Sequence, residues 1–384
     1  KFLVLCLLLP TASSYLRIHH LIRSYNYGTN NYVYKSSSNE FSADYITRKE
    51  KLKKVLAREY ISFFDPFESE YYRKDVEFID PLTKLSGTES YSNNVKMLSG
   101  RTLIGSILFE GARINLHAIE ETGPYKLRTR WTLRVCFKIL PWKPVPVFTG
   151  ISEYTLDNDG YVQKQEDYWD SINLEDGNYV PRDKLAGLSE FVKQLFKKEK
   201  MSSNGQMEWP YELLRRGKTY EVRRYPESKV AKTQYENRPQ GFAKLGSYMD
   251  GSNSSKAKIL PLSPCLLEIG KDGNNKNMIW PLAFKFPNGS YSSKKFPEPL
   301  ENDISLEEIG GKVFAVLLFS DPTTEQFVRY YSDQLRKEIG RDGLLPDNAS
   351  ADVFYVAQYD AIFSFSERRN EVWLPLESKL WDRK

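Results

Sequence analysis

The 384-residue sequence contains very little cysteine and very little histidine. Its cysteines are Cys6, Cys136 and Cys265. Because no two of them form a CxxC pair, the sequence argues against a disulfide-stapled secreted domain, a paired-cysteine zinc site and a redox dithiol. Its histidines are His19, His20 and His117. They form no cluster with Cys, Asp or Glu at the spacing of a first-row metal site, so we expect no metal catalysis.

The excess of positive over negative charge is also small. The 55 Lys and Arg residues against 50 Asp and Glu residues leave a net charge of +5. So small an excess gives no reason to expect a nucleic-acid partner. The apolar run at 2–9 is too short to cross a bilayer, and we expect no transmembrane segment in the mature protein. The chain is longer than the roughly 250–300 residues at which a single core stops growing, so we expect two domains.

The N-terminus has the composition of a targeting segment. Lys1, the apolar run and the small residues Ala12 and Ser13 follow the order of a secretory signal. The stretch that follows, 15–39, is rich in basic residues, Ser and Asn, and contains no acidic residue. Together these resemble the bipartite signal and transit presequence of proteins imported into plastids with extra membranes. We therefore expect a presequence at 1–40 and a plastid (chloroplast) location, with a secreted protein as the alternative.

The first domain is predicted at 41–200 and mixes helix with antiparallel sheet. Apolar residues recur at helical spacing over 52–64, and Asp65-Pro66 ends that pattern. A shorter helix is predicted near 91–98. From 127 to 137 the apolar period becomes two, and turn residues at 122–124 and 157–160 separate further strands. One long helix followed by a curved sheet predicts an α+β cone in which the sheet wraps the helix.

A motif of form Tyr-Tyr-x-x-Asp-Val-x-Phe-x-Asp-Pro at 71–81 and the ending Tyr168-Trp169-Asp170 resemble an NTF2-like (DUF2358-type) module of plant and algal plastid proteins. Modules of this fold are enzymes, binding cups or adaptors. The acid/base candidates here are Asp75, Asp80, His117 and Glu120. Their spacing fixes no pair, so hydrolase or isomerase activity is a third hypothesis only. The basic face at 128, 130 and 134 is predicted to be solvated or to pair with Glu110, Glu120 and Glu121.

A charged and flexible composition marks a linker at 201–208. Just before it, an apolar pattern at 188–196 has two explanations. The pattern fits a helix that packs against the first domain, and it also fits a basic amphipathic helix on a membrane surface. We favour packing against the first domain.

The second domain is predicted at 209–384 and contains an internal repeat. Two units of strand, strand, helix and strand follow one another, with helices at 240–250 and 322–340. The second helix carries Val328, Tyr331, Leu335 and Ile339 on one stripe. This repeat predicts a β-barrel flanked by two helices that are related by a pseudo-two-fold axis.

Four motifs of this domain resemble those of the SOUL heme-binding family. They are Tyr220-Glu221-Val222-Arg223-Arg224-Tyr225-Pro226, Phe284-Lys285-Phe286-Pro287, Pro297-Glu298-Pro299 and Arg368-Arg369-Asn370-Glu371-Val372-Trp373. The resemblance covers essentially the whole second domain. It implies a SOUL-type β-barrel that binds heme or protoporphyrin in a shallow apolar groove beside its first helix.

Carrying that groove onto this sequence nominates seven residues as ligand contacts. They are Phe242, Lys244, Leu245, Tyr248, Met249, Trp280 and Phe363. Lys244 is the candidate partner for a propionate. The apolar residues of the helix have an equally good alternative, which is packing in the core. Arg369 and Glu371 are expected to lock the last strand as scaffold.

Two departures from the family pattern concern the metal. No histidine occurs between 209 and 384, so no axial imidazole is available. The segment 259–264 also lacks the Met-Thr pair usual in that strand. We therefore expect a non-enzymatic tetrapyrrole carrier or buffer in plastid tetrapyrrole metabolism, with a heme-degrading enzyme as the partner that the resemblance implies. The alternative is a protein-interaction scaffold that has lost ligand binding.

Overall fold

The computed structural model describes residues 41–196, 207–270, 276–285, 291–292, 296–348, 352–359, 369–378 and 381. The predicted presequence, most of the predicted linker, Phe363 and Arg368 lie outside these residues. The described residues from Ser42 onward belong to one compact unit.

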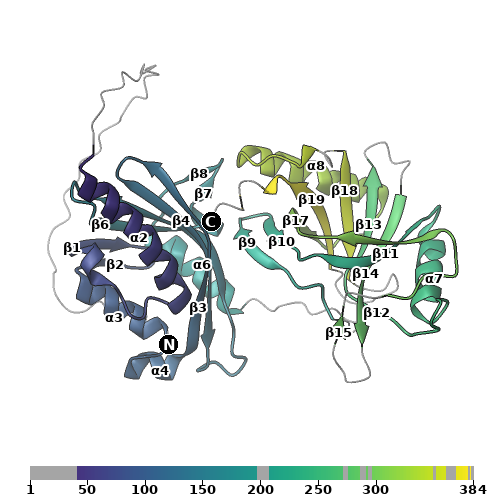
Figure 1. The fold of residues 1–384 in the computed structure, drawn as a ribbon, viewed down its shortest axis with the longest axis horizontal. Coiled ribbons are helices and arrows are strands. Elements are labelled where there is room, and N and C mark those ends of the chain that lie inside the picture. The colour runs from purple at the N-terminus through teal and green to yellow at the C-terminus, as the bar shows by residue number, and fades with distance from the viewer. Residues whose placement is uncertain are drawn as a thin grey trace, which may run out of the picture. The chain divides into compact units, whose positions relative to one another are not determined.

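The first sheet has six strands in the order β2-β1-β6-β5-β4-β3. Its strands are β1 (Tyr72–Ile79), β2 (Lys84–Ser86), β3 (Phe109–Gly123), β4 (Lys126–Phe137), β5 (Val147–Leu156) and β6 (Val162–Trp169). The accompanying elements are α2 (Ala43–Ser62), η1 (Ser69–Tyr71), α3 (Thr88–Leu98), α4 (Leu103–Leu108), α5 (Asp170–Asn173), β7 (Leu174–Glu175), β8 (Asn178–Tyr179) and α6 (Lys184–Phe196). All neighbours in the six-stranded sheet are antiparallel except β1 and β6, which run parallel. Figure 1 shows α2 lying across one face of this sheet.

Helix α2 begins nine residues before the apolar pattern that predicted it. The Ser42 side chain accepts a hydrogen bond from the Tyr45 backbone N–H at 3.1 Å, so Ser42 caps the helix. Phe63 takes a left-handed conformation and ends it. The stripe of Leu52, Leu56 and Tyr60 is buried as expected, and the Tyr60 hydroxyl lies 2.7 Å from the Thr129 hydroxyl on β4. The predicted contact between the helix and the inside of the sheet is confirmed.

Large side chains fill the space between α2 and the sheet. Trp131, Tyr60 and Tyr154 are each at most 2% exposed, and the Trp131 indole donates to the Ser152 hydroxyl at 2.8 Å. Gly150 makes room for Trp131, because a Cβ there would lie 3.0 Å from the indole ring and 2.1 Å from the Tyr168 carbonyl oxygen. The interior of the cone is therefore a packed core.

Three of the four acid/base candidates have separate partners in this part of the fold. Asp75 is exposed and pairs with Arg73 at 2.9 Å. The Asp80 carboxylate accepts the Leu82 and Thr83 backbone N–H groups, both at 2.6 Å, and so closes a turn. His117 lies with Thr132 on the opposite face of the sheet. Asp75, Asp80 and His117 do not hydrogen-bond one another, so they do not form the acid/base pair that the third hypothesis needs.

Glu59 of α2 is buried and predicts a specific pH dependence of stability. It is 1% exposed and accepts the Tyr72 hydroxyl at 2.9 Å, yet burial raises its pKa to about 7 from its usual 4.5. Between these two values the unfolded chain is ionised while the folded chain keeps its proton. As the pH rises between these two values, the free energy of unfolding should therefore fall by about 1.4 kcal/mol per pH unit because of Glu59.

The variant Glu59→Gln should remove this slope, since glutamine does not ionise. Urea unfolding at pH 5, 6 and 7 measures it, and Glu77→Gln on the exposed face of β1 serves as the control. Equal slopes for wild type and Glu59→Gln would contradict the assignment.

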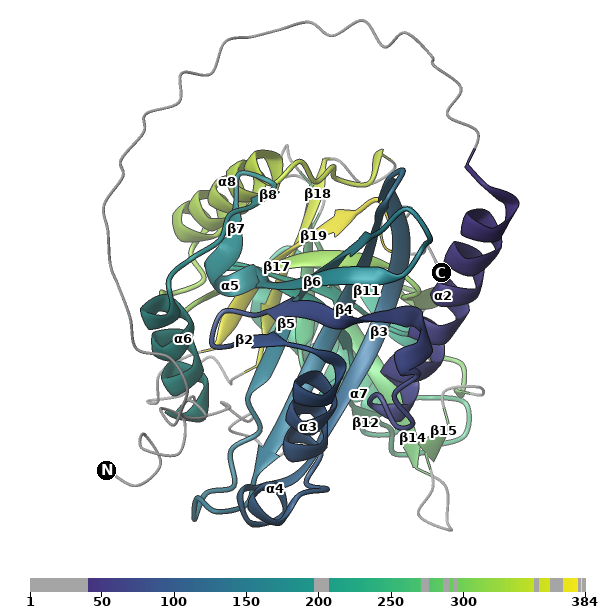
Figure 2. The ribbon, with the colours of Figure 1, turned by 90° about the vertical axis from the view of Figure 1, so that its left-hand side faces the viewer.

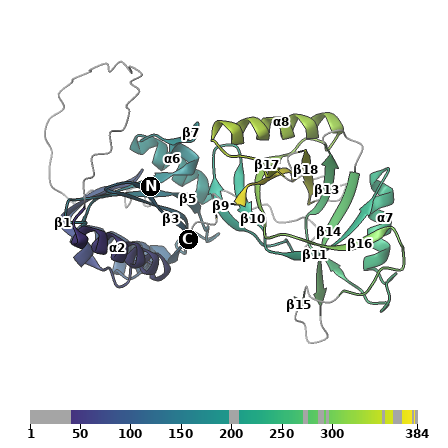
Figure 3. The same ribbon diagram turned by 45° about the horizontal axis from the view of Figure 1, so that its top comes forward.

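The second sheet has eleven strands, with the main path β16-β11-β14-β13-β18-β19-β17-β10-β9 and with β12 and β15 paired to β14. Its strands are β9 (Glu212–Arg216), β10 (Glu221–Arg224), β11 (Ser228–Gln234), β12 (Leu260–Pro261), β13 (Cys265–Gly270), β14 (Lys276–Lys285), β15 (Tyr291–Ser292), β16 (Ile304–Ile309), β17 (Val313–Phe319), β18 (Val353–Gln358) and β19 (Asn370–Leu376). Two helices accompany it, α7 (Arg238–Met249) and α8 (Glu325–Arg341). Figure 3 shows the sheet curled, with α7 and α8 at its flanks. The α+β class and the two flanking helices are confirmed.

Both faces of the second sheet are buried. On β17, Val313, Ala315 and Leu317 belong to the cluster that includes the buried residues of α7 and α8. The alternate residues Phe314 and Val316 belong to a second cluster on the other face. This explains why the strand reads as a continuous apolar run in the sequence. The predicted stripe on α8 packs into the first cluster, with Tyr331 partly buried there.

Candidate functional site

Helix α7, beside which the ligand groove was predicted, packs tightly on β11 and β14. The Asn237 side chain accepts the Gln240 backbone N–H at 3.1 Å and caps the helix. Gly241 faces the sheet, where a Cβ would lie 2.9 Å from the Met278 methyl carbon. This close approach brings the apolar side of the helix into the core.

Three of the seven nominated residues lie in that core. Leu245 and Tyr248 are 0% exposed and Met249 is 5% exposed. The Tyr248 hydroxyl donates to the Pro297 carbonyl at 2.9 Å. Packing in the core, the alternative considered for the helix residues, is therefore what the structure favours for these three. They support the helix from below and are not open to a ligand.

Phe242 and Trp280 come together at the edge of the same helix. Both are half-buried, with ring centroids 5.6 Å apart and an interplanar angle of 80°. The Trp280 indole donates to the Leu262 carbonyl at 3.1 Å, which holds the ring in place. Lys244 is half-buried and forms an ion pair with Asp303.

One turn beyond Phe242, the surface of α7 carries a glycine in place of a side chain. Gly246 shares a stripe with Phe242, and a Cβ added there would meet nothing within 4 Å. Leu260, on the short strand β12 next to β14, is 40% exposed. The aromatic pair and the glycine one helical turn away offer a shallow apolar surface that suits a flat ligand.

A cavity of about 200 Å³ lies at the N-terminal ends of α7 and α8. Its lining residues are Tyr235, Glu236, Asn237, Arg238, Ile269, Lys276, Glu325, Val328, Arg329 and Phe354. Ile269 and Phe354 give it an apolar part, and Arg238, Lys276 and Arg329 give it cations. The sequence reasoning missed this cavity, because its walls come from elements as far apart as 235 and 354. It is smaller than the roughly 300–1,000 Å³ of typical ligand pockets.

The closing motif of the chain forms a buried ionic cluster inside the curled sheet. Glu371 is 0% exposed and accepts hydrogen bonds from Arg223 at 3.0 Å, from the Tyr359 hydroxyl at 2.9 Å and from the Trp373 indole at 2.8 Å. Arg369 lies 3.3 Å from Glu371 and 2.7 Å from Glu208. The expected scaffold role of Arg369 and Glu371 fits this geometry. The partner Arg223, 148 residues away, was not foreseen.

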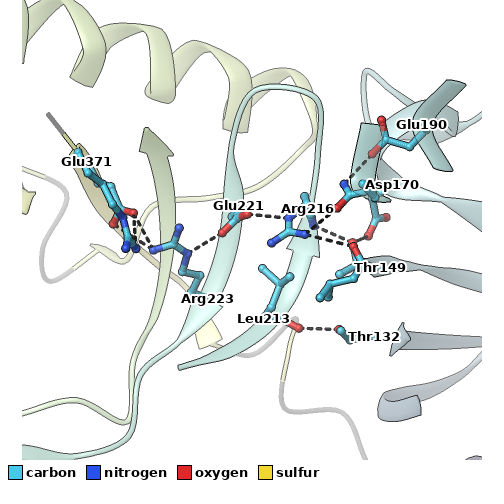
Figure 4. Close-up of polar contacts among 12 residues, drawn as sticks. Thr132, Thr149, Asp170, Glu190, Leu213, Arg216, Glu221, Arg223 and Glu371 are labelled. Atoms are coloured by element: carbon cyan, nitrogen blue, oxygen red, sulfur yellow. Dashed lines mark hydrogen bonds and ion pairs between the residues drawn. The ribbon is translucent and has the colours of Figure 1, made fainter. Parts of the chain in front are cut away.

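A continuous chain of polar contacts links Glu371 to the first sheet (Figure 4). Glu221 binds both Arg223 and Arg216 at 2.7 Å. The Arg216 backbone N–H donates to the Thr149 hydroxyl at 2.7 Å, and that hydroxyl donates to Asp170 at 2.6 Å. Strand β9, which carries Arg216, therefore joins the two sheets.

The basic face of β4 differs from its prediction at Arg130. We expected a solvated arginine or a pair with Glu110, Glu120 or Glu121. Instead Arg130 pairs with the fully buried Asp170 at 3.1 Å and lies 5.6 Å from the Trp381 ring. Burial tends to raise the pKa of Asp170, but Arg130 and Arg215 hold it below its usual range. The reason for the difference is that β9 and Trp381 cover this face.

His117 also lies where the first sheet contacts β9. Its ring lies 2.8 Å from the Thr132 hydroxyl and 3.1 Å from Glu212 at the start of β9. The Thr132 hydroxyl also donates to the Leu213 carbonyl at 2.6 Å. His117 therefore holds the two sheets together.

Comparison with known families agrees with both halves of this fold. Residues 206–375 match the family model described as SOUL heme-binding protein. The second half of the chain is a SOUL domain. Residues 50–165 match a second family model, described as an uncharacterized conserved protein (DUF2358). The SOUL match spans the curled sheet, both flanking helices and the Glu371 cluster.

The curated relatives of the SOUL domain are heme-binding proteins. Heme-binding protein 2 of Homo sapiens is 28% identical over 166 residues, which cover 41% of this chain and 77% of the relative. Heme-binding protein 1 of Mus musculus is 28% identical over 181 residues, with 43% and 90% covered. An NTF2-like protein of unknown function from Exiguobacterium sp. 255-15 has 15% identity and a TM-score of 0.24, covering 30% of this chain and 98% of its own. Among the described residues, no helix has the length and apolarity needed to span a membrane.

Proposed function

We propose that the SOUL domain binds heme or a related tetrapyrrole reversibly, and that the protein is a carrier or buffer. The observation that carries this proposal is the match of 206–375 to the SOUL heme-binding family, together with two relatives named heme-binding proteins. A carrier needs no catalytic group at its site.

The binding surface that we propose is the edge of α7 with Phe242, Trp280 and the bare turn at Gly246. A macrocycle laid on these groups would remove apolar area from water, which stabilises binding by about 25 cal/mol per Å². Lys244 is placed to meet a propionate if it exchanges its partner Asp303. The other nominated helix residues keep this edge rigid.

The macrocycle face, and not the iron, should dominate recognition. No histidine lies between 209 and 384. Met249 is buried, the Tyr248 hydroxyl is occupied by Pro297, and burial raises the pKa of Cys265, which opposes formation of a thiolate ligand. We therefore expect similar affinities for hemin and for metal-free protoporphyrin IX.

Titration of the full chain with both ligands tests the proposal. Binding should change the Soret band of hemin and quench Trp280 fluorescence. The variants Phe242→Ala and Trp280→Ala each remove about 60 Å² of apolar contact and should weaken binding by about tenfold. Tyr330→Ala on α8, an exposed aromatic outside the proposed surface, is the matched control. If neither ligand produces a spectral change at tens of micromolar, tetrapyrrole binding is ruled out.

We further propose a plastid as the site of action and a heme-degrading enzyme as the partner. The composition of 1–40 supports the plastid location. Expression of 1–40 fused to a fluorescent protein tests the location, and a secreted fusion would refute it.

A further inference from the structure

An apolar surface at the end of the first sheet has no place in the proposed tetrapyrrole site. We call it the α4 patch. It consists of Leu103, Ile104, Ile107, Ile139, Trp142, Val145 and Phe196. Leu103 is 81% exposed, Ile104 59%, Ile107 55%, Trp142 52% and Phe196 63%. Exposed apolar groups gathered in this way mark an interaction surface, whereas scattered single residues do not.

The loop that carries Ile139, Trp142 and Val145 joins the end of α4 to the end of α6. The Lys138 backbone N–H donates to the Leu108 carbonyl at 3.1 Å, which places the loop after β4 beside the end of α4. The Trp142 ring lies 5.4 Å from that of Phe196, and its indole donates to the Leu195 carbonyl at 3.0 Å. Figure 2 shows α4 at the lower end of β3.

The fold itself turns these side chains outward. Gly105 is the buried residue of α4, and a Cβ there would lie 2.2 Å from the Met97 carbonyl oxygen of α3. The helix therefore presses its glycine side against α3, and Leu103, Ile104 and Ile107 are left on the other side. In the same way α6 buries Phe191 and Leu195, as expected from the sequence, but leaves Phe196 exposed.

Basic side chains outnumber acidic ones around the α4 patch. Arg101, Lys138, Lys143 and Lys193 are exposed there. Asp65 lies 2.9 Å from Arg101, and Glu110 lies 3.8 Å from Lys143. Among the described residues, no acidic partner is found for Lys138 or Lys193. Arg101 and Lys143 are paired with these two anions, so the positive charge of the rim comes from Lys138 and Lys193.

We propose that the α4 patch docks the protein on an anionic lipid surface. The patch residues do not line the cavity at the N-terminal ends of α7 and α8, and an exposed apolar face of this kind suits a deformable lipid surface. Trp142 is 52% exposed and belongs to the residue type that is enriched at membrane interfaces. The basic rim is complementary to anionic headgroups.

Vesicle binding by the full chain tests this docking independently of tetrapyrrole binding. Co-sedimentation should be strong with phosphatidylcholine vesicles that contain phosphatidylglycerol and weak with phosphatidylcholine alone. Trp142 emission should shift to the blue on binding. The double variant Ile104→Ser with Ile107→Ser should reduce the partition coefficient by about tenfold or more. Lys138→Glu with Lys193→Glu should reduce it only for the anionic vesicles.

The double variant Leu300→Ser with Tyr330→Ser removes two equally exposed apolar side chains elsewhere and should bind as wild type does. Unchanged unfolding curves establish that the variants are folded. Absence of binding to anionic vesicles, or equal binding by the serine variant of α4, would overturn the proposal. So would a dimer in sedimentation velocity that Ile104→Ser with Ile107→Ser dissociates, because the patch would then be a self-association surface.

Discussion

Replacing Glu371 with alanine is expected to lower the free energy of unfolding by about 3–5 kcal/mol. Glu371 is fully buried, and the positive charge of Arg223 would lose the carboxylate that faces it at 3.0 Å. The Tyr359 hydroxyl and the Trp373 indole would lose their acceptor at the same time. Arg223 keeps Glu221 at 2.7 Å, but Arg223 and Arg369 both lose a buried carboxylate that offsets the cost of removing their charges from water.

Urea unfolding of the full chain measures this loss. The control is Glu308→Ala, which removes the exposed partner of Lys229 and should cost at most about 1 kcal/mol. The variant Glu371→Gln should cost less than Glu371→Ala, since its amide oxygen can still accept from Trp373. Replacing Arg223 and Glu371 together by Met and Leu should recover most of the loss. A loss below 1 kcal/mol for Glu371→Ala would mean that the cluster is not a stabilising centre.

Replacing Asp170 with alanine is expected to cost a similar amount, about 3–5 kcal/mol, and to uncouple the two sheets. Asp170 is fully buried, pairs with Arg130 at 3.1 Å and accepts the Thr149 hydroxyl at 2.6 Å. That hydroxyl in turn receives the Arg216 backbone N–H of β9. Loss of the carboxylate leaves Arg130 unpaired and frees Thr149 to rotate away from β9.

Calorimetry distinguishes this outcome from a uniform loss of stability. Wild type should unfold in one transition and Asp170→Ala in two. Asp176→Ala, which removes the exposed partner of Arg341, should leave one transition. The pKa of Asp170 is lowered in the folded state, so its contribution is present above its unfolded pKa and is lost as the pH falls. A single transition for Asp170→Ala would show that other contacts of β9 hold the sheets together.

In the SOUL domain, the Glu371 cluster and the proposed ligand surface lie on different sides of the sheet. The family's closing motif supplies Glu371 and Arg369, and both point into the curled sheet to bind Arg223 and Glu208. The proposed ligand edge at Phe242 and Trp280 lies on the helix side of the sheet. Variants of the motif should therefore affect stability first and ligand affinity second.

Local patterns in the sequence were sufficient for several elements. The helical stripes of α2, α7 and α8 and the alternation along β4 were predicted correctly, because side chains three to four residues apart on a helix, or two apart on a strand, share one face. The order of turns also indicated an antiparallel sheet wrapped on a helix. The parallel pairing of β1 with β6 was not foreseen, since nothing in either strand specifies its neighbour.

What the sequence determined by itself is the main helices and strands, their amphipathic faces and the motifs that resemble the SOUL family. Tertiary structure decided which polar groups are paired and which apolar groups are exposed. Arg130 is half-buried because β9 covers its face, Glu371 meets an arginine 148 residues away, and α4 is turned outward by the contact of Gly105 with α3. Burial and charge pairing depend on which distant segments come together in the fold. The periodicity of residues within one segment carries no information about its distant neighbours.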